Sequence, residues 1–245
     1  MTPPLLLLDA GNTRLKWARV EDGRWHERGA SAYDDLGELI KTAERTGPGG
    51  QCWIASVAGA ARQHLIEQSL SEMALTLHWL ESQAEQRGVT NLYSSPKQLG
   101  TDRWMALLAA RGRSQDACLV VSAGTAMTVD ALAADGQFLG GIIVPGIALT
   151  GQALQQGTAL VAQTDGQMRT FPRNTADAVH SGALLAMAGA IGLMHGRLSS
   201  LAAVRPRCLL TGGDADLLMP LLEFDAECVP DLVLEGVLLA ATAGR

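Results

Sequence analysis

Two turns of the same design lie far apart in this chain, and each follows a run of apolar residues. The first turn is the segment 9–13 (DAGNT) after Leu5–Leu8, and the second is the segment 122–126 (SAGTA) after 119–121. A strand that ends in such a glycine turn exposes backbone N–H groups and a hydroxyl, which suit a phosphate. Gly11 and Gly124 are 124 − 11 = 113 residues apart, nearly half of the 245-residue chain. The spacing predicts a duplicated α/β fold with a nucleotide between its halves.

The order of the expected elements supports this duplication, because both halves begin with a strand, a glycine turn and a second strand. Expected strands cover 5–8, 15–20, 52–57, 75–79, 118–122, 127–133, 138–144 and 207–210, and expected helices cover 35–44, 60–70, 104–112, 147–157, 175–201 and 232–241. A third glycine turn follows the strand at 207–210. The end of the helix at 104–112 predicts two domains, residues 1–113 and 114–245.

Composition excludes several classes of function. Apolar residues make up 47% of the chain and charged residues 18%, with a net charge of −6 and no cluster of Lys and Arg, so we expect no nucleic-acid partner. The four cysteines are widely spaced and predict neither a disulfide framework nor a zinc site. Uncharged stretches at 136–164 and 178–196 are interrupted by glycine and polar residues, so we expect no membrane partner and a cytoplasmic protein.

The residues around the glycine turns suit phosphate chemistry. Asp9 can hold Mg²⁺ against the phosphates of ATP, because Mg²⁺ is usually bound by one or two carboxylates and phosphate oxygens. Lys16 can reach a terminal phosphate, and Thr125 can donate its hydroxyl to one. Each also has an ordinary structural role, Asp9 and Thr125 as turn caps and Lys16 as a solvated strand residue. The commonest nucleotide motifs, including the P-loop and the dinucleotide-binding glycine motif, are absent from the sequence.

The segment 101–104 (TDRW) precedes an expected helix. Thr101 and Asp102 are ordinary residues for a helix N-terminus. Arg103 is less ordinary, because a cation in the first turn opposes the helix dipole and indicates an external anion there. A carboxylate that accepts a hydroxyl proton, beside a guanidinium that binds an acidic substrate, is what a kinase for a small acid needs.

Segments along nearly the whole chain resemble type III pantothenate kinases, members of the acetate and sugar kinase/Hsp70/actin superfamily. The first phosphate motif of that family resembles the run Asp9, Ala10, Gly11, Asn12, Thr13, Arg14, Leu15 and Lys16. Its second phosphate motif is similar to 123–128 (AGTAMT), and its substrate motifs are similar to 93–96 (YSSP) and 100–103 (GTDR). Further matches are 140–146 (GGIIVPG), 174–175 (NT) and, with the superfamily's adenosine loop, 211–213 (TGG).

The resemblance implies two ribonuclease-H-like α/β domains with ATP in the cleft between them. It implies ATP-dependent phosphorylation of pantothenate to 4'-phosphopantothenate, the first step of coenzyme A biosynthesis. Asp102 would accept the proton, and Thr175 would reach the substrate from the partner subunit of a homodimer with a shared site. The other implied pantothenate-binding residues are Tyr93, Gly100, Thr101 and Arg103.

Two positions depart from the family pattern. Ser95 replaces the usual Asn before Pro96, and Ser122 stands where the family commonly has an Asp associated with a monovalent cation, K⁺ or NH₄⁺. A neutral hydroxyl at Ser122 weakens the expectation of that cation. Two alternatives remain beside the pantothenate kinase: another small-acid or sugar kinase of the superfamily, and a non-catalytic regulatory accessory protein. Catalysis is favoured by the presence together of Asp9, Lys16, Asp102, Arg103 and Thr125.

Overall fold

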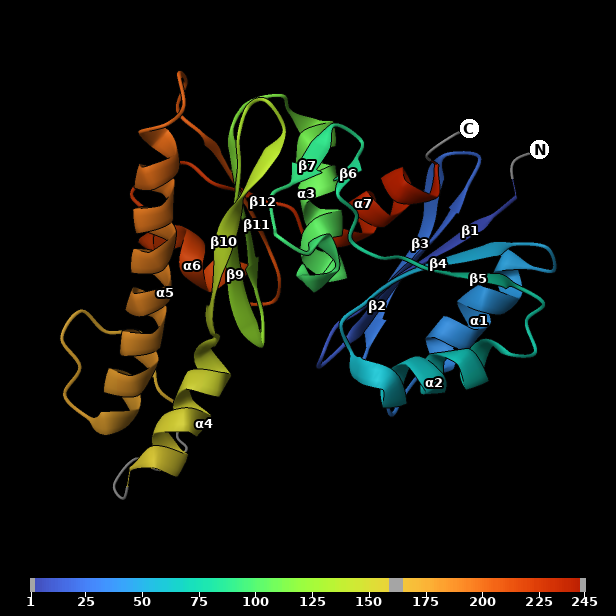
Figure 1. Cartoon of the computed structure of the whole chain (residues 1–245). Coiled ribbons are helices and arrows are strands. Elements are labelled where there is room, and N and C mark those ends of the chain that lie inside the picture. The colour runs from blue at the N-terminus through green and yellow to red at the C-terminus, as the bar shows by residue number, and fades with distance from the viewer. Residues whose placement is uncertain (1–2, 159–164, 243–245) are drawn as a thin grey trace. The chain divides into compact units, whose positions relative to one another are not determined.

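The computed structural model describes residues 3–158 and 165–242. The chain divides into two compact units, here called unit 1 (Met1–Arg113 with Asp231–Arg245) and unit 2 (Ser114–Pro230). Figure 1 follows the chain through both. The domains predicted from the sequence, 1–113 and 114–245, differ from these units at residues 231–245.

Unit 1 is built on a mixed sheet whose strands follow the order β3-β2-β1-β4-β5. The strands are β1 (Leu5–Ala10), β2 (Leu15–Glu21), β3 (Arg24–Ser31), β4 (Gln51–Ser56) and β5 (Thr76–Trp79). The central strand β1 pairs antiparallel with β2 and parallel with β4. Asp22 and Gly23 join β2 to β3 with φ of 49° and 75°, the left-handed pair that a tight hairpin turn requires.

Helices cover both faces of this sheet, which explains why β1 is apolar along most of its length. Helices α1 (Gly37–Thr46) and α2 (Gly59–Leu70) lie together on one side in Figure 1, and their buried residues join the core cluster of Leu6 and Leu8. Helices α3 (Thr101–Arg113) and α7 (Leu232–Ala241) contact each other and the sheet. A Cβ at Gly236 of α7 would lie 1.9 Å from the carbonyl oxygen of Met105, so only glycine fits there.

The position of α7 accounts for the difference in domain division. Its residues Leu232, Val233, Leu234 and Val237 are buried, and the helix packs against α3, β1 and β4 of unit 1. The sequence predicts the helix itself at 232–241, and the structure confirms it. An apolar helix at the end of a chain carries no sequence signal for which of two cores it joins.

A short hairpin in unit 1 was not predicted. It comprises β6 (Glu85–Gln86) and β7 (Val89–Asn91), joined by Arg87 and Gly88 with φ of 52° and 75°. The strands are too short to show an alternating pattern, and the only local signal is the Arg-Gly turn. A single 3₁₀ turn, η1 (Pro96–Gln98), then leads to α3.

Unit 2 repeats the topology of unit 1. Its strands are β8 (Cys118–Ala123), β9 (Ala126–Leu132), β10 (Gln137–Pro145), β11 (Arg207–Thr211) and β12 (Glu227–Cys228), in the order β12-β11-β8-β9-β10. Strand β8 pairs antiparallel with β9 and parallel with β11, as β1 does with β2 and β4. Counted from the first strand of each unit, the sheet of unit 1 and these five strands of unit 2 follow the same order, 3-2-1-4-5. The predicted duplication is therefore confirmed at the level of topology.

The helices of unit 2 are α4 (Ile147–Gly157), α5 (Thr175–Ser199) and the short α6 (Ala215–Leu218), followed by the 3₁₀ turn η2 (Met219–Leu221). Asn174 caps α5, because its side-chain oxygen accepts the N–H of Asp177 at 2.8 Å. Among the described residues, α5 alone is long and apolar enough to span a membrane, yet it buries Leu184, Met187 and Ile191 in the core of unit 2. The irregular segment expected before α5 includes residues 159–164, which lie outside the described part.

Candidate functional site

Asp9 lies near the end of β1, directly opposite Lys16 of β2 in the antiparallel register. Burial raises the pKa of Asp9 to about 7; the positive charge of Lys16 lowers this pKa, and the nearby carboxylate of Asp102 raises it. Asp9 and Asp102 therefore interact within unit 1, although they are far apart in sequence. Two carboxylates held close together in a partly buried place are typical of functional sites.

The turn after Asp9 is fixed at its base by two hydrogen bonds. The N–H of Gly11 donates to the carbonyl of Arg14 at 3.1 Å, and the hydroxyl of Tyr33 donates to the carbonyl of Gly11 at 2.7 Å. Asn12 and Thr13 between them are exposed. The sequence analysis missed Tyr33, because a lone tyrosine between β3 and α1 carries no motif.

Two members of the predicted phosphate motif serve the core. The side chains of Ala10 and Leu15 are fully buried in the cluster between the sheet and helices α1 and α2. Only their backbone atoms remain for a ligand, and the carbonyl of Ala10 already accepts the N–H of Val57 at 3.0 Å. The side chains of these two residues therefore pack the strand ends on either side of the turn into the core.

The second cluster of predicted residues lies at the start of α3. This helix begins at Thr101, three residues earlier than expected, and the N–H of Trp104 donates to the carbonyl of Gly100 at 3.0 Å. Asp102 is partly buried, and one of its oxygens accepts the N–H of Arg103 at 2.8 Å. Burial raises the pKa of Asp102, and Arg103 partly offsets that rise. A Cβ at Gly100 would lie 2.7 Å from the Asp102 carboxylate, so glycine leaves room for it.

Arg103 and Tyr93 lie together in unit 1. Arg103 is only 6% exposed, its guanidinium donates to the Tyr93 hydroxyl at 3.2 Å, and it lies 5.9 Å from the centre of the Tyr93 ring. A buried Asn91 holds the loop that carries Tyr93: its side chain accepts the Tyr93 N–H at 3.0 Å and donates to the Pro96 carbonyl at 3.3 Å. Asn91, which the sequence analysis did not identify, holds both ends of the loop in which Ser95 departs from the family pattern.

The glycine turns of unit 2 pack backbone against backbone. A Cβ at Gly146 would lie 2.1 Å from the carbonyl oxygen of Gly124, and one at Gly212 would lie 2.1 Å from that of Ala123. The predicted second phosphate motif, the 140–146 segment and the third glycine turn therefore meet around the end of β8. Thr125, at the tip of the first of these turns, is exposed.

Ser122 is a partly buried residue at the end of β8. It pairs with Thr128 of β9 and with Thr211 of β11, so hydroxyl residues flank it on both neighbouring strands. Among the described residues, no cluster of three or more His, Cys, Asp or Glu side chains could hold a metal ion. The single carboxylate of Asp9 still suits Mg²⁺, which takes most of its other ligands from phosphates and water.

Thr175 lies at the start of α5, exposed and beside a mainly apolar groove of about 370 Å³ in unit 2. The groove is lined by Val144, Pro145, Thr150, Leu154, Thr175, Ala178, Val179, Gly182, Ala183, Ala186 and Met187. It therefore lies between the end of β10, α4 and the first half of α5. Tyr93, Gly100, Thr101, Asp102 and Arg103 all belong to unit 1, whereas Thr175 belongs to unit 2.

Two comparisons with known proteins, by family model and by sequence relatives, give the same family. The model of the type III pantothenate kinase family matches residues 5–197. The type III pantothenate kinase of Thiobacillus denitrificans is 51% identical over 239 residues, which cover 98% of this chain and 97% of the relative.

Two solved structures resemble this chain along nearly all of its length. A conserved putative Baf family transcriptional activator from Campylobacter jejuni has a TM-score of 0.58 and 22% identity, covering 94% of each chain. A putative 2-dehydro-3-deoxygalactonokinase from Sinorhizobium meliloti has a TM-score of 0.59 and 18% identity, covering 98% of each chain. At such identities the likeness concerns the fold alone, and it confirms the expected α/β type.

Proposed function

Since the chain belongs to the type III pantothenate kinase family and phosphorylates pantothenate in coenzyme A biosynthesis, we propose that Asp9, Asp102 and Arg103 carry that reaction. The observation that supports these roles is the pair of interacting carboxylates in unit 1. Burial raises the pKa of both Asp9 and Asp102. A buried carboxylate with a raised pKa binds a positive charge readily, either a cation or a proton. This suits Asp9 as the group that binds a cation and Asp102 as the group that accepts a proton.

Asp102 is the proposed general base. It accepts the proton of the pantothenate hydroxyl as the hydroxyl oxygen attacks the γ-phosphorus of ATP and the bond to the β-phosphate oxygen breaks, which leaves ADP. A raised pKa makes a carboxylate a better proton acceptor near neutral pH. The bond from the Arg103 N–H fixes one Asp102 oxygen, so the carboxylate has a set orientation when substrate binds.

Asp9 is the proposed residue for Mg²⁺, which would neutralise charge on the phosphates of bound ATP. Lys16, opposite Asp9 in the register, supplies a cation for the terminal phosphate. The turn 11–14 would donate backbone N–H groups to phosphate oxygens. Thr125 of unit 2 would donate its hydroxyl to a phosphate oxygen. No monovalent cation has a role in the proposed mechanism, because Ser122 supplies a neutral oxygen in place of a carboxylate.

Arg103 is the proposed ligand of the pantothenate carboxylate. A guanidinium can bind a carboxylate through two parallel hydrogen bonds, and Tyr93 holds this guanidinium from one side. Because Arg103 is largely buried, a carboxylate that reaches it exchanges water for a strong charge-assisted contact. Arg103 would therefore select acids over neutral analogues of the same shape.

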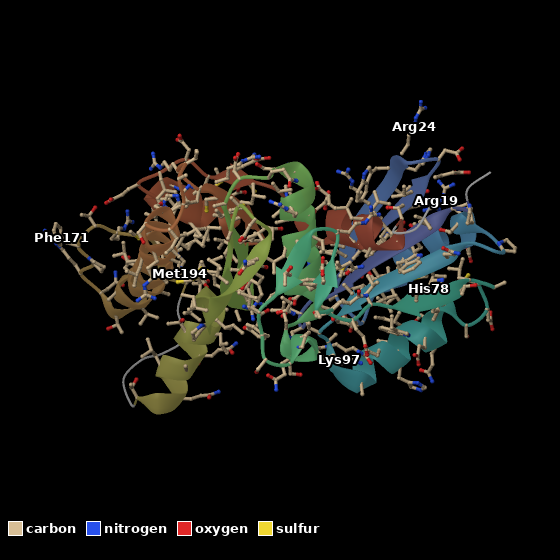
Figure 2. All side chains as sticks on the ribbon, turned by 45° about the horizontal axis from the view of Figure 1, so that its top comes forward. Arg19, Arg24, His78, Lys97, Phe171 and Met194 are labelled. Carbon is tan, nitrogen blue, oxygen red and sulfur yellow. The ribbon has the colours of Figure 1, made fainter. Side chains whose placement is uncertain are left out.

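Replacing Arg103 with alanine should raise the KM for pantothenate by about 10- to 100-fold, the range for a lost hydrogen bond to a charged group. The wild type should prefer pantothenate to panthenol, in which an alcohol replaces the carboxylate, and R103A should lose most of that preference. Initial rates with both substrates give the ratio, which does not depend on the fraction of folded enzyme. R24A is the control, because Arg24 is exposed at the tip of the β2–β3 hairpin (Figure 2). An unchanged preference in R103A would refute the role.

The proposed active unit is a cytoplasmic homodimer that associates through α5. Thr175 of each subunit completes the substrate site of the other subunit. One face of α5 is exposed although it is apolar or small throughout: Ala178, Gly182, Leu185, Ala186, Gly189 and Leu193. Leu185 is 50% exposed and Leu193 is 59% exposed, and Phe171 just before the helix is 86% exposed and points away from unit 2 (Figure 2). Glycines on that face have open space where a Cβ would stand, so a second helix can approach closely.

Mixing two inactive variants tests the shared site. In a hybrid of D102N and T175R subunits, one of the two sites receives both native residues, so a 1:1 mixture should recover up to about a quarter of wild-type activity. A mixture of D102N with D9N is the control, because Asp9 and Asp102 belong to the same unit of one subunit, so no site of a hybrid receives both native residues. A monomer in sedimentation at assay concentrations, or no recovery in the first mixture, would overturn the proposal.

A further inference from the structure

The hydrogen bond between Tyr33 and Gly11 joins two distant parts of unit 1. Tyr33 lies between β3 and α1, and its hydroxyl donates to the Gly11 carbonyl at 2.7 Å across a separation of 22 residues. The Gly11 N–H already closes the turn onto Arg14. Both main-chain polar groups of Gly11 are therefore engaged, and Tyr33 supplies the bond that comes from outside the turn.

Tyr33 is itself held from two sides. Its ring packs against the core cluster beneath the sheet, and the guanidinium of Arg62 from α2 lies 4.9 Å from the ring centre. Burial raises the pKa of Tyr33 to about 12, so its hydroxyl remains a proton donor throughout the neutral range. Among the described residues, Arg62 forms no ion pair with a carboxylate, and its guanidinium lies over the Tyr33 ring.

We propose that Tyr33 is a positioning residue for the nucleotide, which sets the turn 11–14 through the Gly11 carbonyl, and that Arg62 fixes the Tyr33 ring for this purpose. The proposal rests on the role of this turn as the phosphate loop given under Proposed function. An exposed turn between two strands has several accessible conformations. Nucleotide affinity is reduced by the free energy needed to hold the turn in the one conformation that binds. A bond from the rigid part of the unit reduces that cost before ATP arrives.

Removing the Tyr33 hydroxyl tests this directly. Y33F keeps the ring and its contact with Arg62, and should raise the KM for ATP about three- to tenfold, the equivalent of one net hydrogen bond, without changing the KM for pantothenate. R62Q should shift the KM for ATP in the same direction by a smaller factor. S69A is the matched control: the Ser69 hydroxyl also donates to a backbone carbonyl, that of Leu65 at 2.8 Å, but within α2.

A fourth variant separates failure of this inference from failure of the proposed site. N12D places a negative charge on an exposed residue of the turn and should weaken ATP binding if the turn meets phosphates. If N12D raises the KM for ATP while Y33F and R62Q leave it unchanged, the positioning role is wrong and the phosphate loop stands. If none of the three changes it, the phosphate loop itself is wrong. The positioning role would also be wrong if Y33F raised the KM for ATP and the KM for pantothenate equally, or if S69A raised the KM for ATP as much as Y33F does. Tyr33 would then have only a structural role.

Discussion

Replacing Asp9 with asparagine should stabilise the folded chain at pH 8 while it removes most of the kinase activity. The fold raises the pKa of Asp9 to about 7 because the carboxylate is buried, so the native state holds a proton that the unfolded chain has already released. Between about pH 4, where a free aspartate titrates, and pH 7, wild-type stability therefore falls as pH rises. Asparagine carries no such charge, so D9N should be more stable by roughly 2 kcal/mol or more at pH 8.

Thermal unfolding of D9N and wild type at pH 4.5 and pH 8 measures this difference. We expect the two midpoints to be close at the lower pH and D9N to be higher at the upper pH. The kcat/KM for ATP of D9N should fall by at least about 100-fold, because a bound cation contributes several kcal/mol to charge stabilisation. D34N, at an exposed position of the same unit, is the control. Equal midpoints at pH 8 would show that Asp9 carries no buried charge there.

The parts of the fold that the sequence predicts are those with strong local patterns. Strands β1 and β8 consist mainly of apolar residues because both of their faces are covered. A glycine in the turn after each strand marks where the strand ends. The same pattern in both halves predicts the duplication. The helix α7 was also predicted, but its attachment to unit 1 depends on the fit of Gly236 against the backbone of α3, which no local pattern encodes.

The candidate site divides in the same way. The residues of glycine motifs and of the segment 101–104 can be named as candidates from sequence, because their types have specific phosphate and proton chemistry. Tyr33 and Asn91 cannot, because each acts through a hydrogen bond to a backbone group that folding brings near. The roles of Ala10 and Leu15 as core residues also follow only from packing, since a motif does not distinguish side-chain from backbone contact.

The second large effect is expected at Asp102. Asparagine has nearly the same shape, and its side-chain oxygen can still accept the Arg103 N–H, so the start of α3 should keep its geometry. Its amide nitrogen cannot accept a proton from the substrate hydroxyl. D102N should therefore lose about 10²- to 10⁴-fold in kcat, the range for a lost acid–base group, with no loss of thermal stability.

The most direct test of the proposed site is the rate of phosphoryl transfer in a single turnover, with D102N or wild-type enzyme loaded with ATP and Mg²⁺ and then mixed with pantothenate. The affinity for ATP is measured separately on the same preparations, with D34N as the control. We predict that D102N binds ATP with wild-type affinity and forms phosphopantothenate about 10²- to 10⁴-fold more slowly. Transfer at the wild-type rate would contradict the assignment of Asp102 as the general base.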